Sequence, residues 1–375
     1  MCPNAARRNG GLWRWLCECC DRVGARQIPS PALTAPGASP LSETACLDPQ
    51  ALLEPSRFYP PPPPVRPDVR EKLDEANGVA IEQLAFTSAV PLGITANDRV
   101  ALRFYRPAHH RSRFALLVLP GIWRRDRWFE DRFCRGLASQ GVSAALLALP
   151  FHWERALRGT PSGGYFLSGD PLWTAAVFRQ AVVDSRAALS LLRGRGAPVG
   201  VVGFSLGGVL AHILMALEPL DLGVSVIAGG DVAGIVWESP LTQAYRRAME
   251  ARGMTRSTLA ALWAAGNPTS YAGRSQASRL LMFNARYDLL LPRKFTEELW
   301  QTHGQPPIRW LPAGHTTAFL FGRTLVEEIL AMIGPSVSGG ASLRRSEYAA
   351  NDQAMEPAGQ KKSEPAHAPF IPTRH

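Results

Sequence analysis

Lysine is almost missing from this chain of 375 residues, although its formal net charge is +10. Only four lysines occur, against 37 arginines, and the arginines are spread along the whole chain. Because no basic block and no recognition motif accompany the charge, we predict no nucleic-acid partner. Dispersed arginine is typical of a solvated surface, and it leaves contact with an anionic lipid surface or an anionic substrate as open alternatives.

Cysteine is scarce after residue 46, where only Cys134 remains. Such a distribution argues against a secreted fold held together by disulfides. The segment "LCECC" (16–20) could bind a soft metal, but a four-coordinate zinc site needs a second pair of ligands that the segment lacks. We therefore expect free thiols, no metal site and no cofactor.

Long apolar runs are missing near the N-terminus, where "GLWRWLC" is interrupted by Arg14. This segment does not predict a signal peptide, and we expect a cytoplasmic protein. The most apolar window, 199–217, approaches the length of a membrane span. Its glycines and central Ser205 instead favour a buried strand, a tight turn and a helix.

Both ends of the chain are poor in periodic apolar segments. Residues 1–70 include an uninterrupted proline run, 60–64, which can form only polyproline II or turns. Residues 335–375 are polar and rich in Ser, Ala and Pro. We predict that both ends are disordered, and that removing 1–70 and 336–375 leaves any activity in a single domain over 80–334.

Between these ends, short β-rich runs alternate with helical patterns, which is typical of a mostly parallel sheet covered on both faces. Helical patterns occupy 172–194, 205–217, 293–303 and 318–333. The first two strands predict a hairpin closed near "GITAND", and 232–275 predicts a small helical cap. The eight predicted strands are 84–90, 99–107, 114–120, 143–150, 198–204, 223–229, 279–285 and 307–312.

The stretch "GFSLGG" contains the pattern G-x-S-x-G as Gly203, Ser205 and Gly207. It follows the fifth predicted strand and begins a helix, so the turn would hold the Ser205 hydroxyl exposed at the carboxyl edge of the sheet. The backbone N–H of Leu206, at the helix N-terminus, would point toward a developing oxyanion. Ser205 is therefore the candidate nucleophile.

A serine nucleophile needs a base, and His315 is the best-placed histidine because it follows the last strand in "LPAGH". His152, after the fourth strand, is its rival. The imidazole in turn needs a carboxylate, for which Asp288 follows the seventh strand and Asp231 follows the sixth. We predict Asp288 as the acid and keep Asp231 as the alternative.

The order Ser205, Asp288, His315 is the order of the α/β-hydrolases, and the chain resembles that superfamily from about residue 80 to 334. The segments "VGVVGFSLGG", "ARYDLLLP" and "AGHTTAFL" also resemble a group of bacterial α/β-hydrolase domain-containing proteins. Where many esterases carry His-Gly, this chain has "LPGIW". Gly121 is retained at this position, and the resemblance then implies the N–H of Ile122 as the second oxyanion donor.

These residues predict a serine hydrolase that cleaves a small-molecule carboxylic ester or thioester through an acyl-serine intermediate. An acyltransferase would use the same three residues, and a non-catalytic binding protein could keep the scaffold. The segment 121–133, "GIWRRDRWFEDRF", has two interpretations. We favour an exposed basic helix start whose tryptophans pack on the sheet; the other is a wall that receives an apolar acyl chain and an acidic group.

Overall fold

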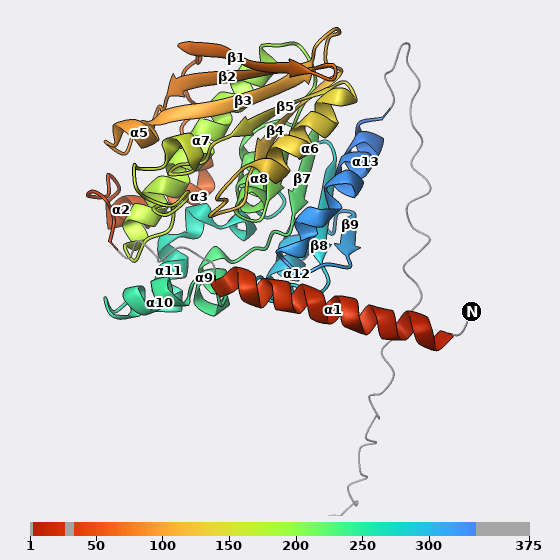
Figure 1. Cartoon of the computed structure of the whole chain (residues 1–375). Helices are drawn as coiled ribbons and strands as arrows, with labels where there is room; N and C mark the ends of the chain where they lie inside the picture. The colour runs from red at the N-terminus through yellow and green to blue at the C-terminus, as the bar shows by residue number, and fades with distance from the viewer. Residues whose placement is uncertain (1–2, 27–33, 335–375) are drawn as a thin grey trace, which may run out of the picture. The chain divides into compact units, whose positions relative to one another are not determined.

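The protein is described by a computed structural model covering residues 3–26 and 34–334, without the side chains of 3–10 and Val69. Nine strands of these residues form one sheet in the order β1-β2-β3-β5-β4-β6-β7-β8-β9 (Figure 1). The strands are β1 (Val69–Ala76), β2 (Val79–Thr87), β3 (Arg99–Pro107), β4 (Phe114–Leu119), β5 (Val142–Leu147), β6 (Val199–Phe204), β7 (Leu222–Val226), β8 (Leu280–Ala285) and β9 (Ile308–Leu311).

The sheet is mostly parallel, as predicted. Strands β4 to β9 pair in parallel with one another, whereas the pairs β1–β2, β2–β3 and β3–β5 are antiparallel. The hairpin expected near "GITAND" is the β2–β3 pair, in which Thr87 lies opposite Arg99. In the parallel half the carboxyl ends of the strands share one edge, which is where ligands bind in open α/β sheets.

The sheet has one strand more than the eight predicted, because β1 was missed. Its sequence, "VREKLDEA", is mostly charged and shows no clear alternation of apolar and polar residues. Most of its described side chains are exposed. It pairs only with β2, through a turn at Asn77 and Gly78, both with positive φ. A charged edge strand buries little apolar surface, so it leaves little trace in a hydrophobic pattern.

Helices cover both faces of the sheet (Figure 1). On one face, α7 (Pro171–Arg193) and α8 (Leu206–Leu217) pack on side chains such as Leu117. On the other, α6 (Trp128–Ser139) and α13 (Gly322–Ile333) pack on side chains such as Leu116. Helix α12 (Arg293–Thr302) follows β8 along the chain. Successive residues of a buried strand point to opposite faces, so β4 is apolar throughout.

The segment predicted to be disordered, 1–70, is helical over much of its described part. It contains α1 (Pro3–Arg26), α2 (Glu43–Cys46), α3 (Gln50–Leu53) and α4 (Pro55–Phe58). Tyr59 is fully buried and its hydroxyl donates to the Ala265 carbonyl oxygen at 2.9 Å. Although this segment has few apolar residues, Cys46, Ala51, Phe58 and Tyr59 are buried in the main hydrophobic core. The predicted tail, 335–375, lies outside the described residues.

Between β7 and β8 the chain forms three short helices, α9 (Val232–Glu238), α10 (Gln243–Glu250) and α11 (Arg256–Leu262). Two 3-10 turns follow, η2 (Ala264–Gly266) and η3 (Pro268–Tyr271). These elements occupy the span in which a helical cap is predicted. Among the helices of the described residues, none is both long enough and apolar enough to cross a membrane.

Candidate active site

Ser205 lies in a sharp turn between β6 and α8, with φ 51° and ψ −113°. Its flanking glycines are required by space. A Cβ on Gly203 would lie 2.0 Å from the Gly207 carbonyl oxygen, and one on Gly207 would lie 2.2 Å from that of Leu119. A Cβ atom cannot lie so close to a carbonyl oxygen. The sharp backbone turn at Ser205 therefore requires glycine at both flanking positions.

A chain of two hydrogen bonds joins Ser205, His315 and Asp288. Ser205 Oγ lies 3.1 Å from His315 Nε2, and His315 Nδ1 lies 2.7 Å from Asp288 Oδ2. The other carboxylate oxygen of Asp288 accepts from the N–H groups of Leu290 and Leu291 at 2.9 and 2.8 Å. The structure thus brings together the three residues that the sequence singles out, and the aspartate is itself held by its own loop.

The fold explains why residues so distant in sequence meet. Strands β6, β7, β8 and β9 are parallel neighbours. Ser205 directly follows β6, Asp288 lies three residues after β8, and His315 lies four residues after β9. The loop after β9 brings the imidazole back across the edge, between the aspartate and the serine.

The surroundings of His315 favour its protonated form. Burial lowers the pKa of the imidazole, but the charge of Asp288, its hydrogen bond and the charge of Asp21 together raise the pKa above its usual 6.5. An imidazole in this position is stabilised when it has accepted a proton from a hydroxyl.

The two alternatives named from the sequence lie elsewhere. Asp231 caps α9, accepting from the Gly234 N–H at 2.9 Å, and binds Arg256 at 2.6 Å. His152 is fully buried, with Nδ1 2.8 Å from the Pro150 carbonyl oxygen, and burial is the main cause that lowers its pKa to about 4. Among the described residues, no hydrogen bond or ion pair joins Asp231 or His152 to His315 or Ser205.

The two residues whose N–H groups are expected to receive an oxyanion belong to the segments that follow β4 and β6. Leu206 is the first residue of α8, and Ile122 follows β4 in "LPGIW". The Gly207 N–H donates to the Pro120 carbonyl oxygen at 3.1 Å, which ties the segment before Ile122 to the start of α8. Both residues line the same cavity as Ser205.

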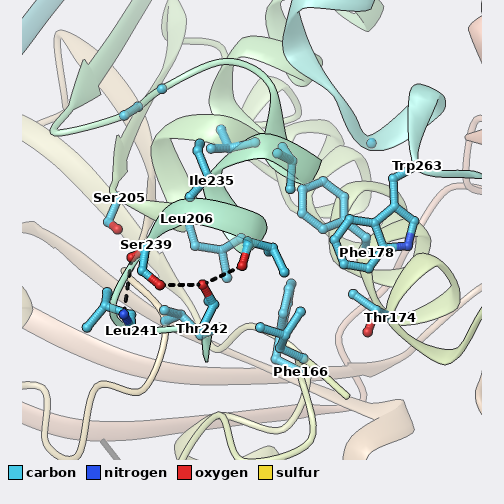
Figure 2. Close-up of a pocket in the computed structure, with 18 of the residues that line it drawn as sticks. Phe166, Thr174, Phe178, Ser205, Leu206, Ile235, Ser239, Leu241, Thr242 and Trp263 are labelled. Carbon is cyan, nitrogen blue, oxygen red and sulfur yellow. Dashed lines mark hydrogen bonds between the residues drawn. The ribbon is translucent and has the colours of Figure 1, made fainter. Parts of the chain in front are cut away.

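That cavity, of about 130 Å³, opens beside Ser205 and His315 and is strongly apolar. Figure 2 places Ser205 and Ser239 on one side and Phe178 and Trp263 on the other. Its hydroxyl groups are occupied within the protein. Thr242 Oγ1 donates to the Val236 carbonyl oxygen at 2.8 Å, and Ser239 Oγ to that of Leu290 at 2.6 Å. The apolar lining includes Ile122, Trp123, Phe166, Leu167, Phe178, Leu206, Val209, Val232, Ile235, Leu241, Leu262 and Trp263.

The segment 121–133 agrees with neither of its interpretations in full. Trp128 is 68% exposed, so it does not pack on the sheet, whereas Trp123 lines the cavity and stacks on Tyr245 of α10. Two of its arginines already have acidic partners: Arg124 pairs with Glu130 and Arg127 with Glu154. The segment therefore supplies apolar wall to the cavity, while these two arginines bind acids of the protein itself.

Part of the cavity wall was not predicted from the sequence. Phe58 and Tyr59, from the N-terminal segment, line the cavity together with residues of α7 and α11. The only signal was the aromatic pair "FY" directly before the proline run. Within the ranges 3–26 and 34–334, no three His, Cys, Asp or Glu residues are grouped so that they could hold a metal ion.

Comparison with known proteins agrees with the fold. No family model matches the chain. A stretch of 189 residues is 30% identical to the uncharacterised protein Rv2627c of Mycobacterium tuberculosis, covering 48% of this chain and 43% of that protein. The chain thus spans less than half the length of this curated relative.

Two solved structures show the likeness of fold. Acetyl xylan esterase 1 from Thermoanaerobacterium sp. JW/SL YS485 is 18% identical, with 82% of this chain and 98% of that one covered and a TM-score of 0.55. The acetyl xylan esterase from Paenibacillus sp. R4 is 14% identical, with 78% and 96% covered and a TM-score of 0.55. With its parallel sheet and its serine turn after β6, the chain has the α/β-hydrolase fold.

Proposed function

We propose that the protein is a serine esterase that hydrolyses a carboxylic ester of an apolar acid. The observation that carries this proposal is the hydrogen-bonded series Ser205, His315 and Asp288, whose serine and histidine line an apolar cavity. Proteins named acetyl xylan esterases share the fold, so ester cleavage is an activity that this scaffold can support. The same series serves acyl transfer and thioester cleavage, which the tests below separate.

The proposed reaction begins with attack of Ser205 Oγ on the ester carbonyl carbon, while His315 Nε2 accepts the hydroxyl proton. The carbonyl oxygen becomes an oxyanion, for which the N–H groups of Leu206 and Ile122 are the proposed donors. The bond to the leaving alcohol then breaks, and the alcohol takes the proton from His315. His315 then deprotonates a water, which attacks the acyl-serine carbonyl carbon. As the bond to Ser205 Oγ breaks, His315 returns the proton to that oxygen and the acid is released.

The cavity indicates the class of acyl group. A sugar or a charged acyl group would need buried polar partners, because an unpaired polar group in such a space costs free energy. The hydroxyls of Ser239 and Thr242 are already bonded to backbone carbonyl oxygens. An aliphatic or aromatic acyl chain, which gains about 0.8 kcal/mol per buried methylene, is the better match.

The test is labelling with a fluorophosphonate probe, followed by peptide mapping. We expect the label on Ser205, and we expect the Ser205→Ala variant to lose both labelling and hydrolysis of p-nitrophenyl butyrate. Ser190→Ala is the control, because Ser190 is exposed on α7 and lies outside both the cavity and the hydrogen-bonded series. Failure of the folded parent protein to label would leave the proposal without support and would favour a binding protein on this scaffold.

A second measurement separates hydrolysis from transfer and esters from thioesters. The acyl-enzyme formed from p-nitrophenyl butyrate is offered water alone or water with butanol, and the acid and ester products are quantified. We expect the acid to dominate at low alcohol concentration. Butyl butyrate as the main product would identify an acyltransferase, and a much higher kcat/KM for a butyryl thioester would identify a thioesterase.

A further inference from the structure

Helix α1 contributes one fully buried carboxylate, Asp21, to the two loops that carry Asp288 and His315. Asp21 Oδ2 accepts from the backbone N–H of Leu289 at 3.0 Å and from that of His315 at 2.9 Å. Asp21 Oδ1 accepts from the N–H of Thr316 at 2.9 Å and from its hydroxyl at 2.6 Å. Leu289 is the neighbour of Asp288, so one side chain joins the acid loop to the base loop.

The base loop is shaped to receive this carboxylate. A Cβ on Gly314 would lie 2.8 Å from Asp21 Oδ2, so any larger residue there would displace the carboxylate. The contact extends along one side of α1. Cys17, one turn before Asp21, is fully buried, and the Trp13 indole N–H donates to the Pro312 carbonyl oxygen at 2.5 Å.

We propose that Asp21 is a positioning residue that holds the imidazole of His315 and the carboxylate of Asp288 in register for catalysis. The inference rests on the proposed esterase function. Asp21 contacts the backbone of the two loops and does not line the cavity, so it acts through His315 and not on the substrate.

A positioning residue is needed because the rate of proton transfer depends on the exact position of the imidazole. Proton transfer from Ser205 requires the imidazole within hydrogen-bonding distance of both partners, and a displacement of about 1 Å can lower the rate about a hundredfold. A loop held only by its ends would sample such displacements. The two carboxylate oxygens of Asp21 accept three hydrogen bonds from the base loop, from the N–H of His315 and from the N–H and hydroxyl of Thr316. Because the acceptor is charged, these hydrogen bonds are strong and limit such displacements.

The carboxylate also acts on the charge of the imidazole. Burial lowers the pKa of His315, and the groups that raise it are Asp288, from the loop after β8, and Asp21, from α1. Removing the charge of Asp21 therefore lowers the pKa of His315. This second effect gives the proposal a measurement that does not depend on turnover.

The central experiment compares Asp21→Asn with the parent protein and with Glu18→Gln. Glu18 lies on the same helix but pairs only with Arg14 and Arg22 within the described part of the chain, so it is a matched control for loss of a carboxylate from α1. We would measure kcat and KM for p-nitrophenyl butyrate, the thermal unfolding midpoint, and the pKa of His315 by NMR of its ring protons.

We expect Asp21→Asn to lower kcat about a hundredfold with KM within twofold of the parent value, and to lower the pKa of His315. Asp21→Glu, which restores the charge, should recover part of both. Glu18→Gln should leave both unchanged. Unchanged kcat and His315 pKa in folded Asp21→Asn would overturn the proposal, as would a kcat loss that follows only the fraction of unfolded protein.

A second variant tests the proposal if Asp21→Asn fails to fold. Gly314→Ala would displace the carboxylate of Asp21, because the added Cβ would lie 2.8 Å from Oδ2, while α1 keeps its own sequence. We expect this variant to lower both kcat and the pKa of His315. Unchanged kcat and His315 pKa in folded Gly314→Ala would refute the proposal.

The two proposals can fail separately. If the parent protein neither labels nor hydrolyses esters, the esterase function fails, while the NMR titration of His315 still reports whether Asp21 controls the imidazole. If the parent is active and Asp21→Asn matches it in both readouts, only the positioning role fails.

Discussion

Asp231 binds Arg256, with its Oδ2 atom 2.6 Å from the guanidinium Nη2, so the partner of this carboxylate is an arginine and not the imidazole of His315. The partner of that imidazole in the structure is Asp288, at 2.7 Å. We predict that Asp288→Asn lowers kcat about ten-thousand-fold, because the amide cannot stabilise the imidazolium or hold its tautomer. Asp231→Asn should stay within a few-fold of the parent, since asparagine also caps helices well.

The measurement for this prediction is kcat with circular dichroism on both asparagine variants side by side. His315→Ala serves as the reference for complete loss of the base. A folded, inactive Asp231→Asn beside a near-normal Asp288→Asn would reverse the assignment of the acid.

The cavity predicts how acyl-chain length affects activity. Ala175→Leu adds apolar atoms to the wall formed by α7, whereas Phe178→Ala removes a ring from the same helix. We expect Ala175→Leu to lower kcat/KM for octanoate esters far more than for acetate esters. Phe178→Ala should shift the preference toward longer chains, by about fourfold for each methylene that becomes buried.

The control for both variants is Leu189→Ala, a buried residue of α7 that does not line the cavity. It should lower thermal stability without changing the chain-length profile. A profile that is flat from acetate to octanoate in the parent protein would contradict the assignment of the cavity to the acyl chain.

The pH dependence of probe labelling follows from His315. The imidazole acts as a base only when neutral, so labelling falls as the pH drops through the pKa of His315. Although burial lowers this pKa, Asp288 and Asp21 raise it above 6.5. We therefore expect the acid limb of the labelling rate, measured from pH 5 to 9, to have its midpoint above 6.5. A midpoint clearly below 6.5 would mean that burial dominates.

We propose that any contact with an anionic lipid surface, an alternative that the sequence leaves open, uses the side of α1 that faces away from the base loop. Leu12, Leu16 and Val23, spaced along one helical face, are 58%, 40% and 52% exposed, and Trp15 beside them is 56% exposed. Arg14 and Arg22 are also largely exposed, and both pair with the single carboxylate of Glu18. Aromatic and aliphatic residues flanked by arginine are typical of helices that lie on anionic membranes.

We expect the protein to sediment with phosphatidylglycerol vesicles more than with phosphatidylcholine vesicles, and less so at high salt. Replacing Trp15 and Leu16 together by Ser should weaken binding at least tenfold. Leu320→Ser, at a residue 71% exposed elsewhere on the surface, is the control. Equal sedimentation with both lipids, or self-association abolished by the same substitutions, would point to a different use of this face.

The sequence predicted what depends on local pattern. The glycines around Ser205 and the apolar strand before it are local signals, and each predicted strand overlaps an observed one. The acid and base could be chosen because parallel strands end at one edge. The positions of Asp21 and Tyr59 could not be predicted in this way, because each depends on how a segment with little apolar surface docks on distant loops. For the same reason, the expectation that residues 1–70 can be removed without loss of activity conflicts with the proposed role of Asp21 and is withdrawn.

The backbone at Ser205 also affects the stability of the protein. With φ at 51°, this residue occupies a conformation that suits glycine and costs other residues of order 1–3 kcal/mol. A glycine at this position should therefore raise the free energy of unfolding by about 1 kcal/mol, which urea denaturation of Ser205→Gly can measure. The native chain would then be less stable than its own inactive variant, as expected where the hydroxyl is retained for chemistry at the expense of folding.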